Sequence, residues 1–217
     1  NKTGMRKEGK LDLERYLLTA KEVADISTLL GDDPEVEIVT PRLALSGLAS
    51  NGRASTIFIA DGIEPGALDR MQTDRWSEEE KNSGLYDDVL KKLDPEHIEV
   101  VDLSEGLVEM LHLSIGGQAA VLTSTLTAQA NALDITVGHA FNTGNANSND
   151  KFAFVSLELA RSLLDAEGRA DRLTILLKDD AQTVAMRDRL LSKIRSAGFD
   201  VEMYTWQQLS DFYNQVH

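Results

Sequence analysis

Cysteine is absent from this 217-residue sequence. Its absence excludes disulfide bonds, thiol catalysis, cysteine-ligated zinc and iron–sulfur clusters. It does not fix the cellular compartment, because a cysteine-free chain suits both the cytosol and the periplasm. No apolar run approaches the roughly 20 residues of a membrane span, and no signal peptide is apparent. We expect the spans of any membrane-bound parent protein to lie outside these residues.

Basic residues are scarce: 22 Lys and Arg stand against 36 Asp and Glu, which gives a net charge of −14. A nucleic-acid partner would need a basic face, so the charge argues against one. The same charge disfavours adsorption to an anionic lipid surface. The apolar content of 42% and the charged content of 27% are ordinary for a globular protein. A chain of this length can hold one large domain or two small ones.

Motifs of catalysis and nucleotide binding are also missing. The sequence has no H-E-x-x-H zinc pair, no G-x-S-x-G nucleophile elbow and no G-x-x-x-x-G-K-[ST] phosphate loop. None of the four histidines lies within four positions of another. We expect His97, His112 and His139 to be structural and assign no role to His217, the last residue.

Two acidic runs are the remaining candidates for acid–base chemistry. One lies around Asp33 and the other around Glu79, and both flank turns. Paired carboxylates serve as acid and base when burial raises the pKa of one of them. Since nothing in the pattern indicates burial, we expect both runs to be solvated. We therefore expect a non-enzymatic protein without catalytic residues, metal ligands or cofactors.

The end of the chain predicts a capped amphipathic helix. Thr205 and Gln208 form a T-x-x-Q capping box. The apolar side chains that follow recur at helical spacing; they are Trp206, Leu209, Phe212, Tyr213 and Val216. We expect Trp206 to pack on a sheet. No Gly or Pro ends this helix, and the chain begins at Asn1 rather than Met, so we expect a domain excised from a longer protein.

The two ends of the chain follow the same order of strand, helix, glycine stop, acidic turn and strand. The expected elements are 11–18, 20–30 and 35–48 at one end, and 173–177, 181–196 and 201–204 at the other. A capping box at Thr19–Glu22 opens the first helix, and a hairpin turn is expected at Ser50–Arg53. The loop-like segment from Asp61 to Gly66 leads into the middle of the chain.

This pattern predicts a mixed α/β (α+β) fold. Residues 1–62 and 170–217 would form a discontinuous lobe of two βαβ-like units. Residues 63–169 would form an inserted β-rich lobe. A single α+β domain is the alternative.

Three residues are candidates for binding a partner. Trp76 lies in a polar setting, where an exposed tryptophan can anchor an interface. Asn145 and Asn147 belong to an oxygen-rich loop between Asn142 and Asp150, which holds too few carboxylates for an EF-hand. The alternatives are a Trp76 folded back onto its own lobe and an ordinary solvated loop.

Four stretches together carry a resemblance to a known family. They are Thr56–Pro65 with its strand and Gly-x-x-Pro turn; Gly106 to Leu122 with a short helix, glycine turn and strand; Ile135 to Leu164; and Tyr204 to Val216. In their order and spacing the chain resembles the extracytoplasmic core domain of ABC-transporter permeases of the FtsX-like family, which includes MacB-type and lipoprotein-releasing permeases. Gly117-Gln118 stands where many members have Gly-Asp, which leaves the subfamily open.

The resemblance implies that the discontinuous lobe is porter-like, with the β-rich lobe inserted into it. It also implies a mechanical role for a periplasmic domain of an inner-membrane protein. Such a domain has no catalytic residues, and ATP is hydrolysed in a separate domain or subunit. Its motion would be coupled to a periplasmic partner or to cargo such as a lipoprotein, peptide or drug. The alternatives are a small-molecule-binding extracytoplasmic domain and, less favoured, a hydrolase that uses the acidic runs.

Overall fold

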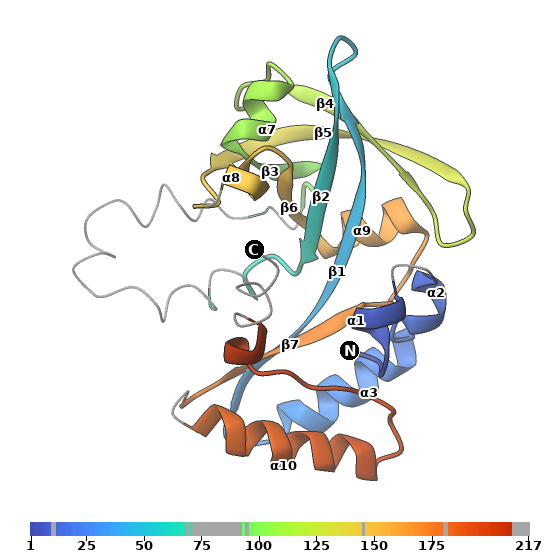
Figure 1. Ribbon diagram of the computed structural model, residues 1–217, viewed down its shortest axis with the longest axis vertical. Helices are drawn as coiled ribbons and strands as arrows, with labels where there is room; N and C mark the ends of the chain where they lie inside the picture. The colour runs from blue at the N-terminus through green and yellow to red at the C-terminus, as the bar shows by residue number, and fades with distance from the viewer. Residues whose placement is uncertain are drawn as a thin grey trace, which may run out of the picture. The chain divides into compact units, whose positions relative to one another are not determined.

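The computed structural model describes residues 1–9, 12–67, 70, 93, 96–144, 146–179 and 182–209. They form a mixed α/β fold, as predicted, with a seven-stranded sheet in the order β2-β6-β3-β5-β4-β1-β7 (Figure 1). The chain divides into two compact units, which we call the terminal unit (Asn1–Thr40 and Gly168–His217) and the central unit (Pro41–Glu167). The functional division into a porter-like lobe and an insertion, with boundaries at 62 and 169, stays a prediction.

The terminal unit packs two helices on two strands. The helices are α3 (Ala20–Gly31) and α10 (Thr183–Ser196), and the strands are β7 (Arg172–Leu177) and the first part of β1 (Val36–Ser50). Apolar side chains at helical spacing face inward on both helices. The buried core consists of Leu18, Val23, Ile26, Leu30, Val36, Ala170, Met186, Leu190, Ile194 and Val201.

Both predicted capping boxes are present. The side chain of Thr19 accepts a hydrogen bond from the Glu22 N–H, and the Glu22 carboxylate accepts one from the Thr19 N–H at 2.8 Å. Thr205 and Gln208 make the same reciprocal pair at 2.9 and 3.3 Å. Residues 206–209 are helical; the rest of the predicted helix lies outside the described residues. Trp206 is 58% exposed, so its expected packing on a sheet is wrong, and Thr205 is the buried residue of this turn.

The strand predicted at 11–18 is wrong. A short helix, α2 (Leu13–Tyr16), forms there because the Asp12 side chain accepts a hydrogen bond from the Arg15 N–H. Leu17 and Leu18 lie four and five positions after Leu13, and this spacing fits a helical turn as well as a short strand. Within residues 12–18, the described part of that range, only Leu18 makes a strand-like bridge, to Ala170.

The strand predicted at 201–204 is likewise reduced to a single bridge, between Val201 and Lys2. Neither βαβ-like unit is therefore complete. A further short helix, α1 (Met5–Glu8), follows this bridge near the start of the chain.

The central unit is a ring of six strands. β1 pairs with β4 on one side and with β2 on the other, and β6, β3 and β5 complete the circle (Figure 1). The β2–β6 and β3–β5 pairs are parallel and the other pairs are antiparallel. The strands are β2 (Ser55–Ile63), β3 (Val100–Ser104), β4 (Gln118–Ser124), β5 (Ala130–Phe141) and β6 (Phe152–Ser156), and the helices are α7 (Glu105–Met110), α8 (Ala146–Asn149) and α9 (Leu157–Leu164).

The inside of this barrel is the core of the central unit. Alternate residues of each strand point inward, and α7 and α9 add leucines. The packed side chains are Ala49, Phe58, Val101, Leu103, Leu107, Val121, Ile135, Ala153, Val155, Leu159 and Leu163. Since alternate residues of each strand form this core, the residues between them face outward.

The predicted hairpin turn joins β1 to β2, which pair from Ser50 with Ser55. Asn51 holds it: its side-chain oxygen accepts from the N–H groups of Arg53 and Ala54 at 2.8 and 2.7 Å. Its side-chain nitrogen donates to the Leu111 carbonyl at the end of α7, at 2.6 Å. One side chain therefore forms the turn and attaches it to the barrel.

Gly62 lies in a strand and not in the predicted loop, since β2 continues to Ile63. A Cβ atom at Gly62 would lie 2.5 Å from the Ala160 Cβ atom of α9 and 2.9 Å from the Leu43 carbonyl oxygen. The glycine therefore permits the close approach of α9 to the barrel.

Candidate functional site

Of the three predicted partner-binding residues, Trp76 and Asn145 lie outside the described residues. Asn147 is exposed on α8, a one-turn helix within the predicted loop. The segment is held by its own side chains: Thr143 N–H donates to the Asn149 side chain at 3.1 Å, and Ser148 donates to Thr143 at 2.9 Å. The role of all three residues in binding stays a prediction.

Asp33 departs from the expectation of a solvated acidic run, because it is buried. The Arg189 guanidinium donates to both of its oxygens, at 2.8 and 2.9 Å, and the Glu35 N–H donates at 3.2 Å. Lys193 lies 3.8 Å away. The hydrogen bonds from Arg189 lower the pKa of Asp33 and outweigh burial, which alone would raise it. A fully paired carboxylate with a lowered pKa is suited to structure and not to proton transfer.

Among the described residues, no group of three or more His, Cys, Asp and Glu side chains is placed to hold a metal ion. The same part of the chain has no helix that is both long and apolar enough to cross a membrane.

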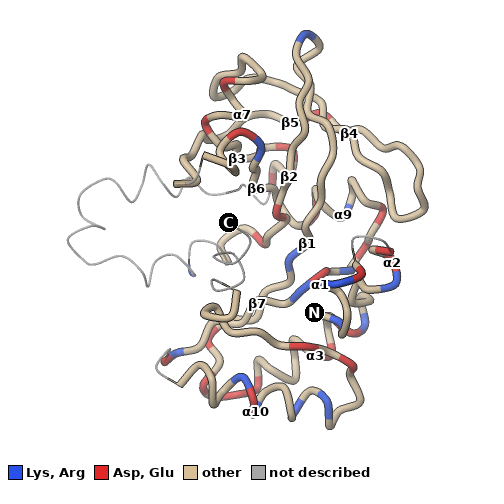
Figure 2. The backbone as a smooth tube through the Cα atoms, viewed as in Figure 1, with Lys and Arg blue, Asp and Glu red and all other residues tan. Residues whose placement is uncertain are grey.

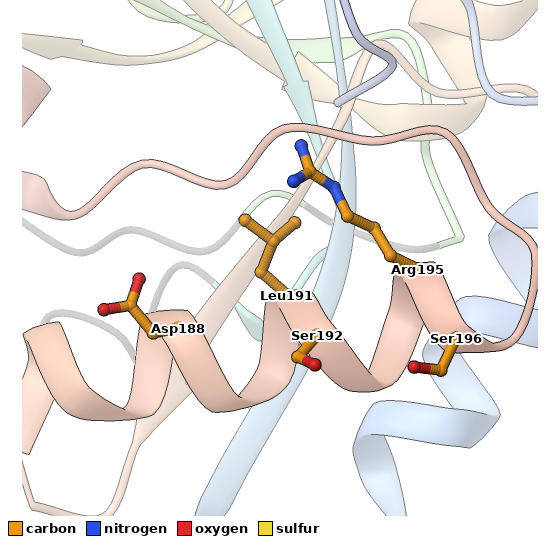
Figure 3. A pocket seen from close by; sticks show the side chains of 5 residues that line it. All are labelled: Asp188, Leu191, Ser192, Arg195 and Ser196. Atoms are coloured by element: carbon orange, nitrogen blue, oxygen red, sulfur yellow. The ribbon is translucent and has the colours of Figure 1, made fainter.

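A shallow groove runs along α10 in the terminal unit (Figure 3). Its lining residues are Asp188, Leu191, Ser192, Arg195 and Ser196. The polar groups do not converge. In Figure 3 the charged groups of Asp188 and Arg195 lie at separate positions along α10, with Leu191 between them. The Arg195 guanidinium is engaged by the Val201 carbonyl, at 3.0 and 3.2 Å. A small-molecule site needs enclosure and converging polar groups, and this groove offers neither.

The outward face of the barrel is the most distinctive surface of the central unit. Leu48 of β1 pairs with Ile57 of β2 and Leu122 of β4, and Leu122 pairs with Ala132 of β5. These four residues, which we call the apolar row, lie side by side across four strands. Their large members are exposed: Ile57 by 61%, Leu48 by 46% and Leu122 by 42%. Ile59, on the same face of β2, is 42% exposed.

Charge is nearly absent around the apolar row. Residues 111–133 contain no Asp, Glu, Lys or Arg, and residues 43–60 contain only Arg53. Figure 2 shows the resulting uncharged stretches of β1, β2, β4 and β5. In a chain with a net charge of −14, an exposed apolar area without charges marks a surface for interaction. The sequence carries this signal as two uncharged segments, but only strand pairing brings them together.

The fold resembles those of the extracytoplasmic domains of two ABC transporters. The periplasmic region of MacB from Actinobacillus actinomycetemcomitans matches 100% of this chain and 88% of that chain, with a TM-score of 0.56 and 13% identity. The extracellular domain of the ABC-type transporter YknZ from Gram-positive bacteria matches 86% of this chain and 87% of that chain, with a TM-score of 0.52 and 11% identity. The resemblance to a MacB-type domain is thus confirmed at the level of the fold.

Comparison by sequence adds nothing to this likeness. No family model matches the chain, and no curated protein matches it significantly.

Proposed function

We propose that the chain is an extracytoplasmic domain of an ABC-transporter permease. In this role it couples ATP-driven motion of membrane helices to a periplasmic partner or to cargo such as a lipoprotein, peptide or drug. The domain performs no catalysis itself. ATP is hydrolysed by an ATP-binding subunit or domain of the same transporter. The parent permease in the inner membrane connects that subunit or domain to the extracytoplasmic domain.

The observation that carries this proposal is the shared fold with two transporter domains over most or all of the chain. The acidic charge is compatible with it, because a domain with a net charge of −14 is repelled by anionic headgroups and projects away from them.

Coupling requires a stiff connection to the membrane. The reciprocal hydrogen bonds of Thr205 and Gln208 fix the start of the C-terminal segment. We propose that this segment joins the domain to a membrane helix. A helix transmits force well, because all its backbone hydrogen bonds are internal.

The simplest test is the reading frame of the parent protein. Apolar segments of roughly 20 residues should lie shortly before Asn1 and shortly after His217. Their absence on both sides would contradict the proposal.

The mechanical test uses the parent permease reconstituted with its ATP-binding partner in proteoliposomes. A Gly-Gly-Ser insertion after Val216 should leave ATP hydrolysis in place and abolish most transport. The same insertion after Thr127, in the turn between β4 and β5, is the matched control and should preserve both activities. Normal transport after the Val216 insertion would count against the proposal.

A further inference from the structure

The first three residues of the chain run antiparallel beside residues 200–202. Lys2 forms a bridge with Val201 at the centre of this pairing. Two hydrogen bonds flank the bridge: the Glu202 N–H donates to the Asn1 carbonyl at 2.9 Å, and the Thr3 N–H donates to the Asp200 carbonyl at 3.2 Å. A pair that lies between such bonds brings its Cα atoms to about 4.5 Å, with both side chains on one face. We call residues 1–3 and 200–202 the clasp.

A tight turn begins inside the clasp and fixes the position of Thr3. The Met5 N–H donates to the Lys2 carbonyl at 3.1 Å, and Gly4 has a φ of 88°. These are the features of a type II turn with Thr3 in its second position. The Thr3 hydroxyl also donates to the Asp200 carboxylate at 2.6 Å. Thr3 therefore holds the clasp through its backbone and through its side chain.

The clasp is attached to both α3 and α10. Val201 is buried in the core that these helices share. The Arg195 guanidinium extends from α10 (Figure 3) and donates to the Val201 carbonyl at 3.0 and 3.2 Å. On the other side, the Lys2 ammonium lies 3.1 Å from the carboxylate of Glu22, a member of the capping box of α3. A displacement of the clasp is therefore passed to both helices at once.

Both outer ends of the clasp point the same way. Because the pairing is antiparallel, a segment that precedes Asn1 and the segment that follows Glu202 leave it at one end. A force that pulls both segments in the same direction leaves the hydrogen bonds between them intact. A force that spreads the segments breaks these bonds one after another. Spreading would also remove Lys2 from the side of the buried Val201, so the closed clasp is favoured.

We propose that the clasp is the single point at which both membrane connections are joined to the terminal unit, and that it stays closed while the transporter works. The two connections then move α3 and α10 together instead of separating within the domain. The mechanical role rests on the proposed function. The closed clasp itself is a property of the isolated chain, so the two parts of the proposal can be tested separately.

Hydrogen exchange on the isolated chain tests whether the clasp is closed. Thr3→Pro removes the N–H and the hydroxyl that bind Asp200, yet proline suits the second position of a type II turn. This variant should exchange the Glu202 amide about tenfold faster or more, since two hydrogen bonds are lost. Thr3→Ser keeps both groups and should exchange like the wild type. The Leu18 amide, which donates to the Ala170 carbonyl at 2.8 Å, should be unchanged in both variants and shows that the terminal unit remains folded.

Two results of this experiment would overturn the proposal. A Glu202 amide that exchanges as fast in the wild type as in Thr3→Pro would mean that the clasp is open in solution. Equal rates in Thr3→Pro and Thr3→Ser would mean that Thr3 does not hold it.

A reversible lock tests the role of the clasp in the parent permease, reconstituted with its ATP-binding partner in proteoliposomes. Lys2→Cys combined with Val201→Cys should form a disulfide, because a Cα separation of about 4.5 Å suits one. Transport should be the same before and after oxidation of this variant. Lys2→Cys alone is the control for other effects of the oxidant. Thr3→Pro should lose most transport while ATP hydrolysis continues, and Thr3→Ser should transport normally.

Transport that stops on oxidation of the double variant and returns on reduction would show that the clasp must open, and would overturn the proposal. Normal transport by Thr3→Pro would overturn it as well, because the clasp would then carry no force. Failure of the proposed function would be seen differently, as a parent protein without apolar segments on either side of the domain. The exchange rates of the isolated chain would not change in that case.

Discussion

Asp33 and Arg189 are joined by two hydrogen bonds, of 2.8 and 2.9 Å, although 156 residues separate them in the sequence. The pair ties the segment after α3 to the middle of α10. Lys193 supports the same connection by donating to the Leu29 carbonyl at 2.9 Å. Helices α3 and α10 are therefore held together by charge as well as by their shared apolar core.

The first prediction concerns the pH dependence of this pair. Because its pKa is lowered in the folded chain, the Asp33 carboxylate contributes stability above the ordinary carboxyl range near pH 4. The contribution is lost as the pH falls through the lowered pKa. Asp33→Asn should reduce the free energy of unfolding by about 2 kcal/mol at pH 7, and the difference from wild type should shrink toward pH 3.

Urea unfolding at several pH values would measure this difference. Asp25→Asn is the matched control, since Asp25 pairs with Lys21 one turn away on the exposed side of α3. Such exposed pairs within a helix are worth about 0.3–0.5 kcal/mol. A gap between wild type and Asp33→Asn that stays constant from pH 7 to pH 3 would refute the assignment.

The second prediction concerns the contact between α9 and β2. Gly62→Ala places a methyl group 2.5 Å from the Cβ atom of Ala160, so the helix or the strand must shift. Overpacking of this kind should lower the free energy of unfolding by about 1–3 kcal/mol. Thermal and denaturant unfolding would measure the loss.

Gly31→Ala is the control for that substitution. A Cβ atom at Gly31 meets nothing within 4 Å, and Gly31 ends α3 in helical conformation. The free energy of unfolding of the Gly31→Ala variant should stay the same or rise by about 0.5 kcal/mol, because alanine favours a helix more than glycine does. Equal effects of the two substitutions would show that the close approach of α9 is unimportant.

The third prediction concerns the capping box of α3. Thr19→Ala removes the side chain that accepts from the Glu22 N–H and should cost about 1 kcal/mol of unfolding free energy. Thr28→Ala makes the same chemical change inside α3, where the hydroxyl donates to the Ala24 carbonyl at 2.9 Å. It should be neutral, since alanine is the better helix former. Denaturant unfolding of both variants and the wild type would measure the two changes. A midpoint that falls equally for Thr19→Ala and Thr28→Ala would contradict the prediction.

Features that depend on a few neighbouring residues could be read from the sequence. Both capping boxes and the turn at Asn51 are local, because each is fixed by side chains within four positions of one another. A helix over 157–164 and a strand over 173–177 can also be predicted, the second from its nearly continuous apolar run, and they agree with α9 and β7. The strand predicted at 11–18 failed for a local reason as well, because the Asp12 cap favoured a helix over the alternating pattern.

Features that depend on distant partners could not be read in this way. The pattern around Asp33 indicates a turn, and its burial follows only from Arg189 on a helix far along the chain. The sequence shows two uncharged segments but does not show that they form the apolar row. Leu48, Ile57 and Leu122 come from three strands, and only the register of those strands brings them together. The order and spacing of four longer stretches nevertheless indicated the fold.

The pairing of β1 with β2 closes the ring of six strands, so every strand of that ring has a neighbour on both sides. A partner cannot join it by adding a strand, as happens at open sheet edges. A partner that binds this barrel must therefore contact its outward side chains. The inward residues form the core that stabilises the fold, whereas the outward residues contribute little to it. Substitutions on the outward face of the barrel can therefore change binding with little effect on the free energy of unfolding.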